Sequence, residues 1–172
     1  MNFKQFFLSL FIFTLFFCGC TDTSKTVENK YEKYIGYINP EKALLKEGKT
    51  LCNINDIKTT YSGAAPYGFK GSKKVFRDFI LSNYNEKLYK DSGYVSFRFL
   101  VNCKGEAGWF EIIEMNLDLE EIDLDDKMIN ELLELTSKKE NWNQLGYEEG
   151  FIDYYMYILY RIENGKIIEI LP

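Results

Sequence analysis

An alternating pattern over residues 93–115 constrains the fold of this chain more than any other part of its sequence. Over residues 95–101, every second side chain is aromatic or β-branched, which predicts a strand with one buried face. Lys104-Gly105 then marks a turn, and residues 109–115 return to a strand-like composition. The pattern therefore predicts an antiparallel hairpin, so that at least part of the fold is β-sheet.

The side chains that would face each other across this hairpin are complementary. A turn centred on Lys104-Gly105 places Arg98 opposite Glu111, so the one basic residue of the first strand meets an acid. The same register pairs apolar residues with apolar residues, namely Phe97 with Ile112 and Phe99 with Phe110. A slip of one residue would lose both kinds of pairing, and we therefore expect this register.

One helix is predicted before this hairpin, and a second helix is predicted after it. The first helix begins at the N-cap residue Ser72 and stops at residues 91–93. Its apolar face consists of Val75, Phe76, Phe79, Ile80, Tyr84 and Leu88. The second helix follows the acidic residues 117–126, and lysines at its end suit the helix dipole. Its apolar face consists of Met128, Ile129, Leu132, Leu133 and Thr136.

The C-terminal residues predict a second hairpin. Residues 152–162 are rich in aromatic and β-branched side chains and are expected to form a long strand. Asn164-Gly165 is a strong turn signal because both residues accept positive φ, and residues 167–171 then form a short last strand. The order helix, strand, strand, helix, strand, strand predicts an α+β fold, with an antiparallel sheet of three to four strands and two helices packed on one face.

The beginning of the chain predicts its location. Residues 6–17 form an apolar run of about a dozen residues, which is too short to span a membrane but suits a secretory signal peptide. Gly19 directly precedes Cys20, and this ending resembles a bacterial lipobox. The resemblance implies removal of residues 1–19, lipidation of Cys20 and a place in the cell envelope. The alternative is an ordinary secreted or membrane-anchored chain.

This boundary also predicts the domain organisation and the kind of partner. We expect a signal peptide at residues 1–19, a polar tether at residues 20–45 and one folded domain at residues 46–172. The chain has 21 basic and 26 acidic residues, a net charge of −5, and removal of Lys4 with the signal peptide brings the charge to −6. An acidic chain does not favour nucleic acid as a partner. The membrane is expected to be reached through the acyl chains on Cys20.

The remaining cysteines predict a disulfide. Cys52 and Cys103 form an even pair in an oxidising compartment, where a disulfide is the expected state, and two buried free thiols are the alternative. The chain has no histidine, and two cysteines do not complete a tetrahedral zinc site. The acidic residues 117–126 lack the glycine and the ligand spacing of a calcium-binding EF-hand loop. No metal or other cofactor is therefore expected.

Residues 75–162 contain three motifs whose order along the chain is similar to that of a known protein family. They are the glycine-led strand GYVSFRFLVNCKG, the tryptophan of Trp142-Asn143-Gln144, and a glycine at the start of residues 150–154. In this order they resemble the C-terminal domain of TonB, which implies that fold and a habit of binding an extended peptide along a sheet edge. The chain lacks the family's proline after the tryptophan and its proline-rich spacer, and it adds a C-terminal strand.

The expected function is that of a non-enzymatic binding module in the cell envelope, with a protein or an extended peptide as its partner. The candidate binding surface consists of Tyr155 and Tyr157 on the long strand, with Tyr67 and Phe69 before the first helix. The alternative for these aromatic residues is a place in the core. An inhibitory or structural lipoprotein would need the same kind of surface, and the sequence does not separate it from a binding module.

The competing hypothesis is an envelope enzyme, such as a hydrolase that uses paired carboxylates. Without histidine the chain has no Ser-His-Asp or Cys-His arrangement. The odd spacing of Glu111 and Glu114 places them on opposite faces of one strand. Glu148 and Asp153 are further acids without an evident partner, and Ser72 is explained by helix capping. We therefore expect no catalytic residues.

Overall fold

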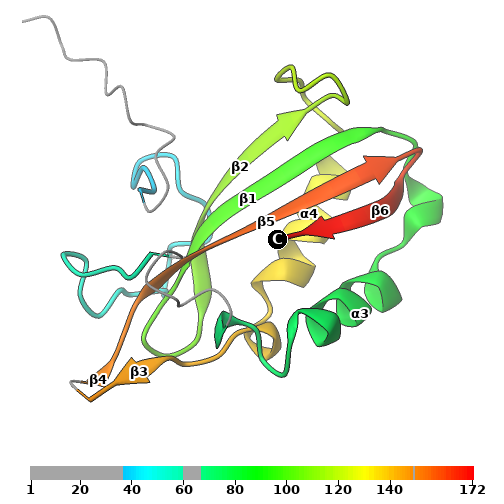
Figure 1. Cartoon of the computed structure of the whole chain (residues 1–172). Helices are drawn as coiled ribbons and strands as arrows, with labels where there is room; N and C mark the ends of the chain where they lie inside the picture. The colour runs from blue at the N-terminus through cyan, green and yellow to red at the C-terminus, as the bar shows by residue number, and fades with distance from the viewer. Residues whose placement is uncertain (1–36, 60–66, 149) are drawn as a thin grey trace, which may run out of the picture. The chain divides into compact units, whose positions relative to one another are not determined.

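The computed structural model describes residues 37–59, 67–148 and 150–172, so Cys20 and the expected signal peptide lie outside the described residues. Its main sheet has four antiparallel strands in the order β2-β1-β5-β6 (Figure 1). The strands are β1 (Gly93–Val101), β2 (Ala107–Met115), β5 (Tyr154–Glu163) and β6 (Lys166–Leu171). The longer helices are α3 (Lys73–Asn83) and α4 (Asp126–Ser137). The short elements are η3 (Glu86–Leu88), η4 (Lys139–Asn141), β3 (Gly146–Tyr147) and β4 (Gly150–Phe151). The expected α+β class is confirmed.

The predicted register of the first hairpin is confirmed over its central part. Phe97 pairs with Ile112, and Arg98 pairs with Glu111. The ladder then shifts between Arg98 and Leu100, beside Trp109, whose φ of 57° is unusual for a bulky residue. The expected backbone pairing of Phe99 with Phe110 is therefore replaced by a bulge, although their rings stack with centroids 4.5 Å apart.

Helix α3 begins where the sequence predicts and ends earlier. The hydroxyl oxygen of Ser72 accepts a hydrogen bond from the Val75 N–H at 3.2 Å, as expected of an N-cap. The helix stops at Asn83 because Tyr84 adopts an extended conformation, and the Tyr84 hydroxyl donates to the Gly165 carbonyl at 2.9 Å. Leu88, which the pattern placed on the helix face, is 66% exposed.

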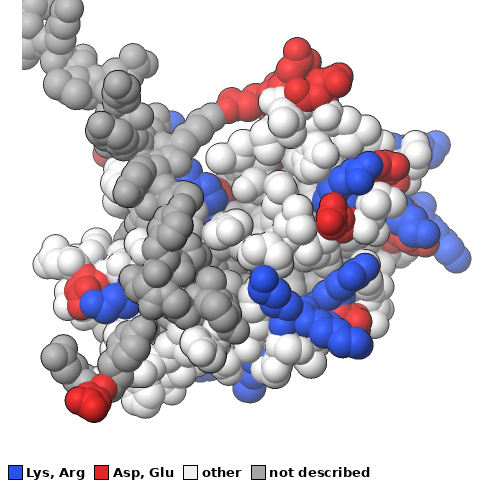
Figure 2. All heavy atoms as spheres, viewed as in Figure 1, with Lys and Arg blue, Asp and Glu red and all other residues white. Residues whose placement is uncertain are grey.

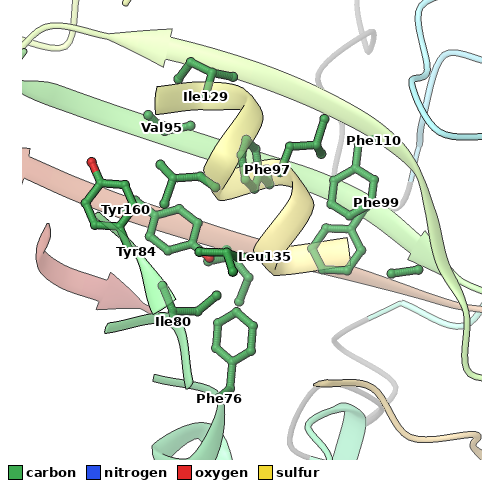
Figure 3. Packing of buried hydrophobic residues seen from close by; sticks show 14 of the residues in the cluster. Phe76, Ile80, Tyr84, Val95, Phe97, Phe99, Phe110, Ile129, Leu135 and Tyr160 are labelled. Carbon is green, nitrogen blue, oxygen red and sulfur yellow. The ribbon is translucent and has the colours of Figure 1, made fainter. Parts of the chain in front are cut away.

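The core lies between the two helices and one face of the sheet. All five residues predicted on the apolar face of α4 are buried. Figure 3 shows side chains of both helices, such as Phe76, Ile80 and Ile129, pointing toward strand residues such as Phe97. Burial of each large apolar side chain contributes about 1.5–3 kcal/mol, so this layer supplies most of the hydrophobic stabilisation.

The opposite face of the sheet is covered by an N-terminal segment. Ile38 and Ala43 form a second buried cluster with Leu100 and Tyr155. Leu44 is bridged to Phe110 of β2 by backbone hydrogen bonds of 2.9 Å in both directions. Residues 37–45, which the sequence analysis assigned to the tether, thus belong to the folded unit, because their apolar side chains complete this second layer.

The C-terminal hairpin follows its sequence signal. Asn164 and Gly165 have φ values of 51° and 76°, as a tight turn of this kind requires. Strand β6 pairs with β5 from Glu163 opposite Lys166 to Leu159 opposite Leu171. Strand β6 therefore lies next to β5 and forms one edge of the sheet.

Alkaline unfolding should be steep, because burial raises the pKa of Tyr84, Tyr154 and Tyr160 above the ordinary value of 10.0. Tyr160 is fully buried, and its hydroxyl lies 2.7 Å from the Thr136 hydroxyl. A raised pKa in the folded state means that stability is intact below pH 10 and declines as the pH rises toward the folded pKa. Urea titrations between pH 8 and 12 should show this decline.

A matched pair of variants tests the cause. Tyr160→Phe should make stability less dependent on pH above 10, whereas Tyr67→Phe should not, because Tyr67 is 71% exposed. Absorbance at 295 nm should show cooperative tyrosine ionisation that coincides with unfolding. Ionisation of every tyrosine near pH 10 in a protein that stays folded would contradict the prediction.

Candidate functional site

The four aromatic residues proposed as a binding surface do not form one. Tyr155 is 1% exposed and Phe69 is 4% exposed, so both are core residues, while Tyr157 is half-buried. Of the four, Tyr67 is exposed. Strand alternation does place Tyr155 and Tyr157 on the face opposite Tyr154 and Met156, but residues 37–59 cover that face.

Arg98 organises this covered face. Its guanidinium lies 3.1 Å from the Glu111 carboxylate, and its Nε donates to the Tyr155 hydroxyl at 3.1 Å. A further N–H donates to the Tyr37 carbonyl at 2.6 Å, while the Asn39 N–H donates to Glu111 Oε1 at 2.5 Å. These contacts connect the N-terminal segment to β1, β2 and β5. The role of the cluster is therefore structural.

Asp153 organises the disulfide. Cys52 and Cys103 are bonded to each other, with Cα atoms 6.0 Å apart. One carboxylate oxygen of Asp153 accepts from the N–H groups of Cys52 and Asn53, both at 2.7 Å, and the other accepts from the Cys103 N–H at 2.8 Å. Cys52, Cys103 and Asp153 have the spacing of possible metal ligands, but the disulfide uses both sulfur atoms. Asp153 therefore binds the backbone at both cysteines of the disulfide.

Two of the other acids considered for catalysis, Glu111 and Glu114, are also held by structural partners, whereas Glu148 is exposed. Although their odd spacing predicts opposite faces of the strand, Glu111 and Glu114 both line a cavity of about 440 Å³ beside β2. Glu111 is bound as described, while the Glu114 carboxylate accepts from the Leu124 N–H at 2.8 Å. Burial raises the pKa of Glu114, with the Leu124 hydrogen bond acting in the opposite direction. Among the described residues, the carboxylates of Glu111 and Glu114 form no hydrogen bond with each other.

Strand β6 is the more open of the two sheet edges. The other edge strand, β2, is bridged at Phe110 by Leu44 and at its last residue, Met115, by Glu121. For residues 166–171 of β6, the described part of the chain provides no backbone partner apart from β5. Ile168 and Leu171 are 41% and 39% exposed, so apolar side chains accompany this unpaired edge.

A groove of about 230 Å³ lies where β6 faces α3. Its apolar lining consists of Phe69, Phe76, Ile158, Ile170 and Leu171, with Pro172 at the chain end. Its basic lining consists of Lys73, Lys74 and Arg77. Figure 2 shows basic side chains gathered over α3 beside the end of β6. A chemically mixed groove next to an unpaired strand is able to hold an extended segment by backbone and side-chain contacts.

The sequence contained part of the signal for this groove. Lys73, Lys74 and Arg77 recur at helical spacing, and the last predicted strand was a natural candidate for a sheet edge. That the helix and the strand lie side by side follows only from the tertiary structure, because the two segments are separated by most of the domain.

Comparison with protein-family models, curated proteins and solved structures finds no match for this chain. The resemblance to the C-terminal domain of TonB therefore stays a prediction. Within residues 37–59, 67–148 and 150–172, no helix combines the length and apolar character that crossing a membrane requires. The apolar run of residues 6–17 lies outside that part of the chain.

Proposed function

We propose that this protein is an envelope-anchored lipoprotein whose domain binds an extended peptide segment along the edge of β6 and catalyses no reaction. The observation that carries the proposal is the outer edge of β6, which pairs with no strand of the described residues and has exposed apolar side chains and a groove beside it. An added strand would satisfy the backbone N–H and C=O groups of that edge, which is the usual source of affinity in this binding mode.

The order of the elements supports a TonB-like domain as the scaffold. Helix α3, hairpin β1–β2, helix α4 and long strand β5 follow one another as in the motifs that suggested the resemblance. Trp142, one of those motif residues, is 2% exposed and packs against Phe69, Phe76 and Phe99. In this chain β6 lies outside β5, so the edge open to a peptide is the outer side of β6.

The peptide-binding proposal is tested with a library of random nine-residue peptides displayed on phage and selected on the full chain in detergent micelles. We expect enriched peptides that bind with micromolar dissociation constants and that slow amide hydrogen exchange in residues 166–171. Synthetic versions N-methylated at alternate amides should lose binding, because they lack the N–H groups that a strand contributes. No enrichment, or equal binding after N-methylation at either set of alternate amides, would contradict the proposal.

The anchor is tested separately. Gly19-Cys20 after the apolar run of residues 6–17 is the observation behind it. The mature protein should begin at Cys20, carry acyl mass on that residue and partition into detergent, and Cys20→Ser should abolish the acyl mass. An intact protein beginning at Met1, without acyl mass, would refute the lipoprotein assignment.

A further inference from the structure

The basic residues of the α3–β6 groove are not explained by the stability of the helix. Lys73 and Arg77 are four residues apart on α3, a spacing at which like charges disfavour a helix. Both are exposed, and neither forms an ion pair with a described residue, while Lys74 pairs with Asp78. The first turn of α3 contains no acid, although the helix dipole favours one there. The arrangement instead leaves positive charge facing the groove.

The groove suits a side chain better than a small-molecule ligand. Its volume of about 230 Å³ is below the ~300–1,000 Å³ of typical ligand pockets. Its lining joins buried aromatic rings, such as Phe76, to the partly exposed Ile170 and Leu171. One large apolar side chain of a bound segment could fill it, while the neighbouring residues of that segment pass the basic rim.

From these features we infer that the groove selects acidic peptides, in which one or two carboxylates flank a large apolar side chain. The inference rests on the proposed function, since it names the chemistry of the segment bound at β6. The chain as a whole carries a net charge of −5, so an acidic partner needs a local group of cations such as the one that borders this groove.

An anionic membrane surface fits these cations less well than a peptide. Basic patches that bind anionic lipid usually contain about four to eight Lys or Arg residues. The groove has three, one of which is paired with Asp78, and they border an apolar recess next to an unpaired strand. The recess suits a side chain, and the strand edge suits a peptide backbone. A lipid headgroup offers neither.

The experiment uses the peptides enriched from the nine-residue library on the full chain. We expect Asp and Glu to be enriched among them, and replacement of these acids by Asn and Gln to weaken binding about tenfold at low salt. On the double variant Lys73→Glu/Arg77→Glu, which makes the rim acidic, the neutral peptides should bind at least as tightly as the original acidic ones. The control Lys104→Glu/Lys127→Glu makes the same change of charge at exposed positions outside the groove and should keep the preference.

Four results would overturn the inference. Enriched peptides without an excess of acids, or acids whose neutralisation leaves binding unchanged, would do so while the β6-edge function stands. An equal loss of preference in the control variant would show a general effect of net charge. Binding of phosphatidylglycerol vesicles by a form without acyl chains, lost in Lys73→Glu/Arg77→Glu, would assign the cations to a membrane surface. Failure to enrich any peptide would instead refute the proposed function itself.

Discussion

Asp153→Asn is expected to lower the free energy of unfolding by about 3 kcal/mol. The native carboxylate is 1% exposed and accepts three backbone N–H groups, from Cys52, Asn53 and Cys103. An amide keeps one acceptor oxygen and turns an NH₂ group toward at least one of these donors, so a charge-assisted network becomes a partly unsatisfied one. Urea denaturation of the oxidised protein measures the effect.

The control is Asp56→Asn, which removes the same charge from the N-terminal segment that Asp153 holds through Cys52 and Asn53. The Asp56 carboxylate pairs with Lys58 at the surface, where its side chain is 54% exposed, and its loss should change stability by less than about 0.5 kcal/mol. Both variants should form the disulfide, as mass spectrometry after thiol labelling will show. An Asp153→Asn protein as stable as the control would mean that the three hydrogen bonds contribute little.

Arg98→Met is expected to cost about 3–5 kcal/mol, because it leaves the buried Glu111 carboxylate without its cation. The Glu111 side chain is 13% exposed, and its remaining contact of those described is the N–H of Asn39. Tyr37 and Tyr155 also lose a hydrogen-bond partner, so residues 37–45 should exchange amide hydrogens faster. Chemical denaturation and hydrogen exchange measure the two effects.

A double variant separates the lost ion pair from lost packing. Arg98→Met/Glu111→Leu removes both charges together and should recover more than half of the lost stability, since an apolar pair often replaces a buried ion pair well. Arg77→Met makes the same substitution at an exposed position of α3 and should be nearly neutral. If the double variant is no more stable than Arg98→Met, the packing of the arginine stem matters more than the charge.

Much of the local structure was predictable because it depends on residues close together in sequence. The Ser72 cap and the Asn164-Gly165 turn lie where the sequence places them. The pairing of Arg98 with Glu111 was also predictable, since the hairpin turn and the polarity pattern agree on one register. The end of α3 was not, because Tyr84 leaves the helix for a hydrogen bond to Gly165, far away in the sequence.

The candidate site was less predictable, because burial depends on which segments meet. Tyr155 and Phe69 carry no local mark that distinguishes a core aromatic residue from a contact residue. Tyr155 is buried because residues 37–59 cover its face, and Phe69 is buried because it packs on Phe76 and Trp142. The groove likewise joins α3 to β6, and neither segment alone shows it.

The sequence by itself determined the α+β class, the two hairpins and the buried face of α4, because periodicity, caps and turn residues act over a few positions. The tertiary structure alone decided that residues 37–45 belong to the fold, that Asp153 clasps the disulfide and that basic residues line the edge of β6. These features arise from contacts between segments distant in the chain, whose energies depend on burial and shape rather than on local pattern.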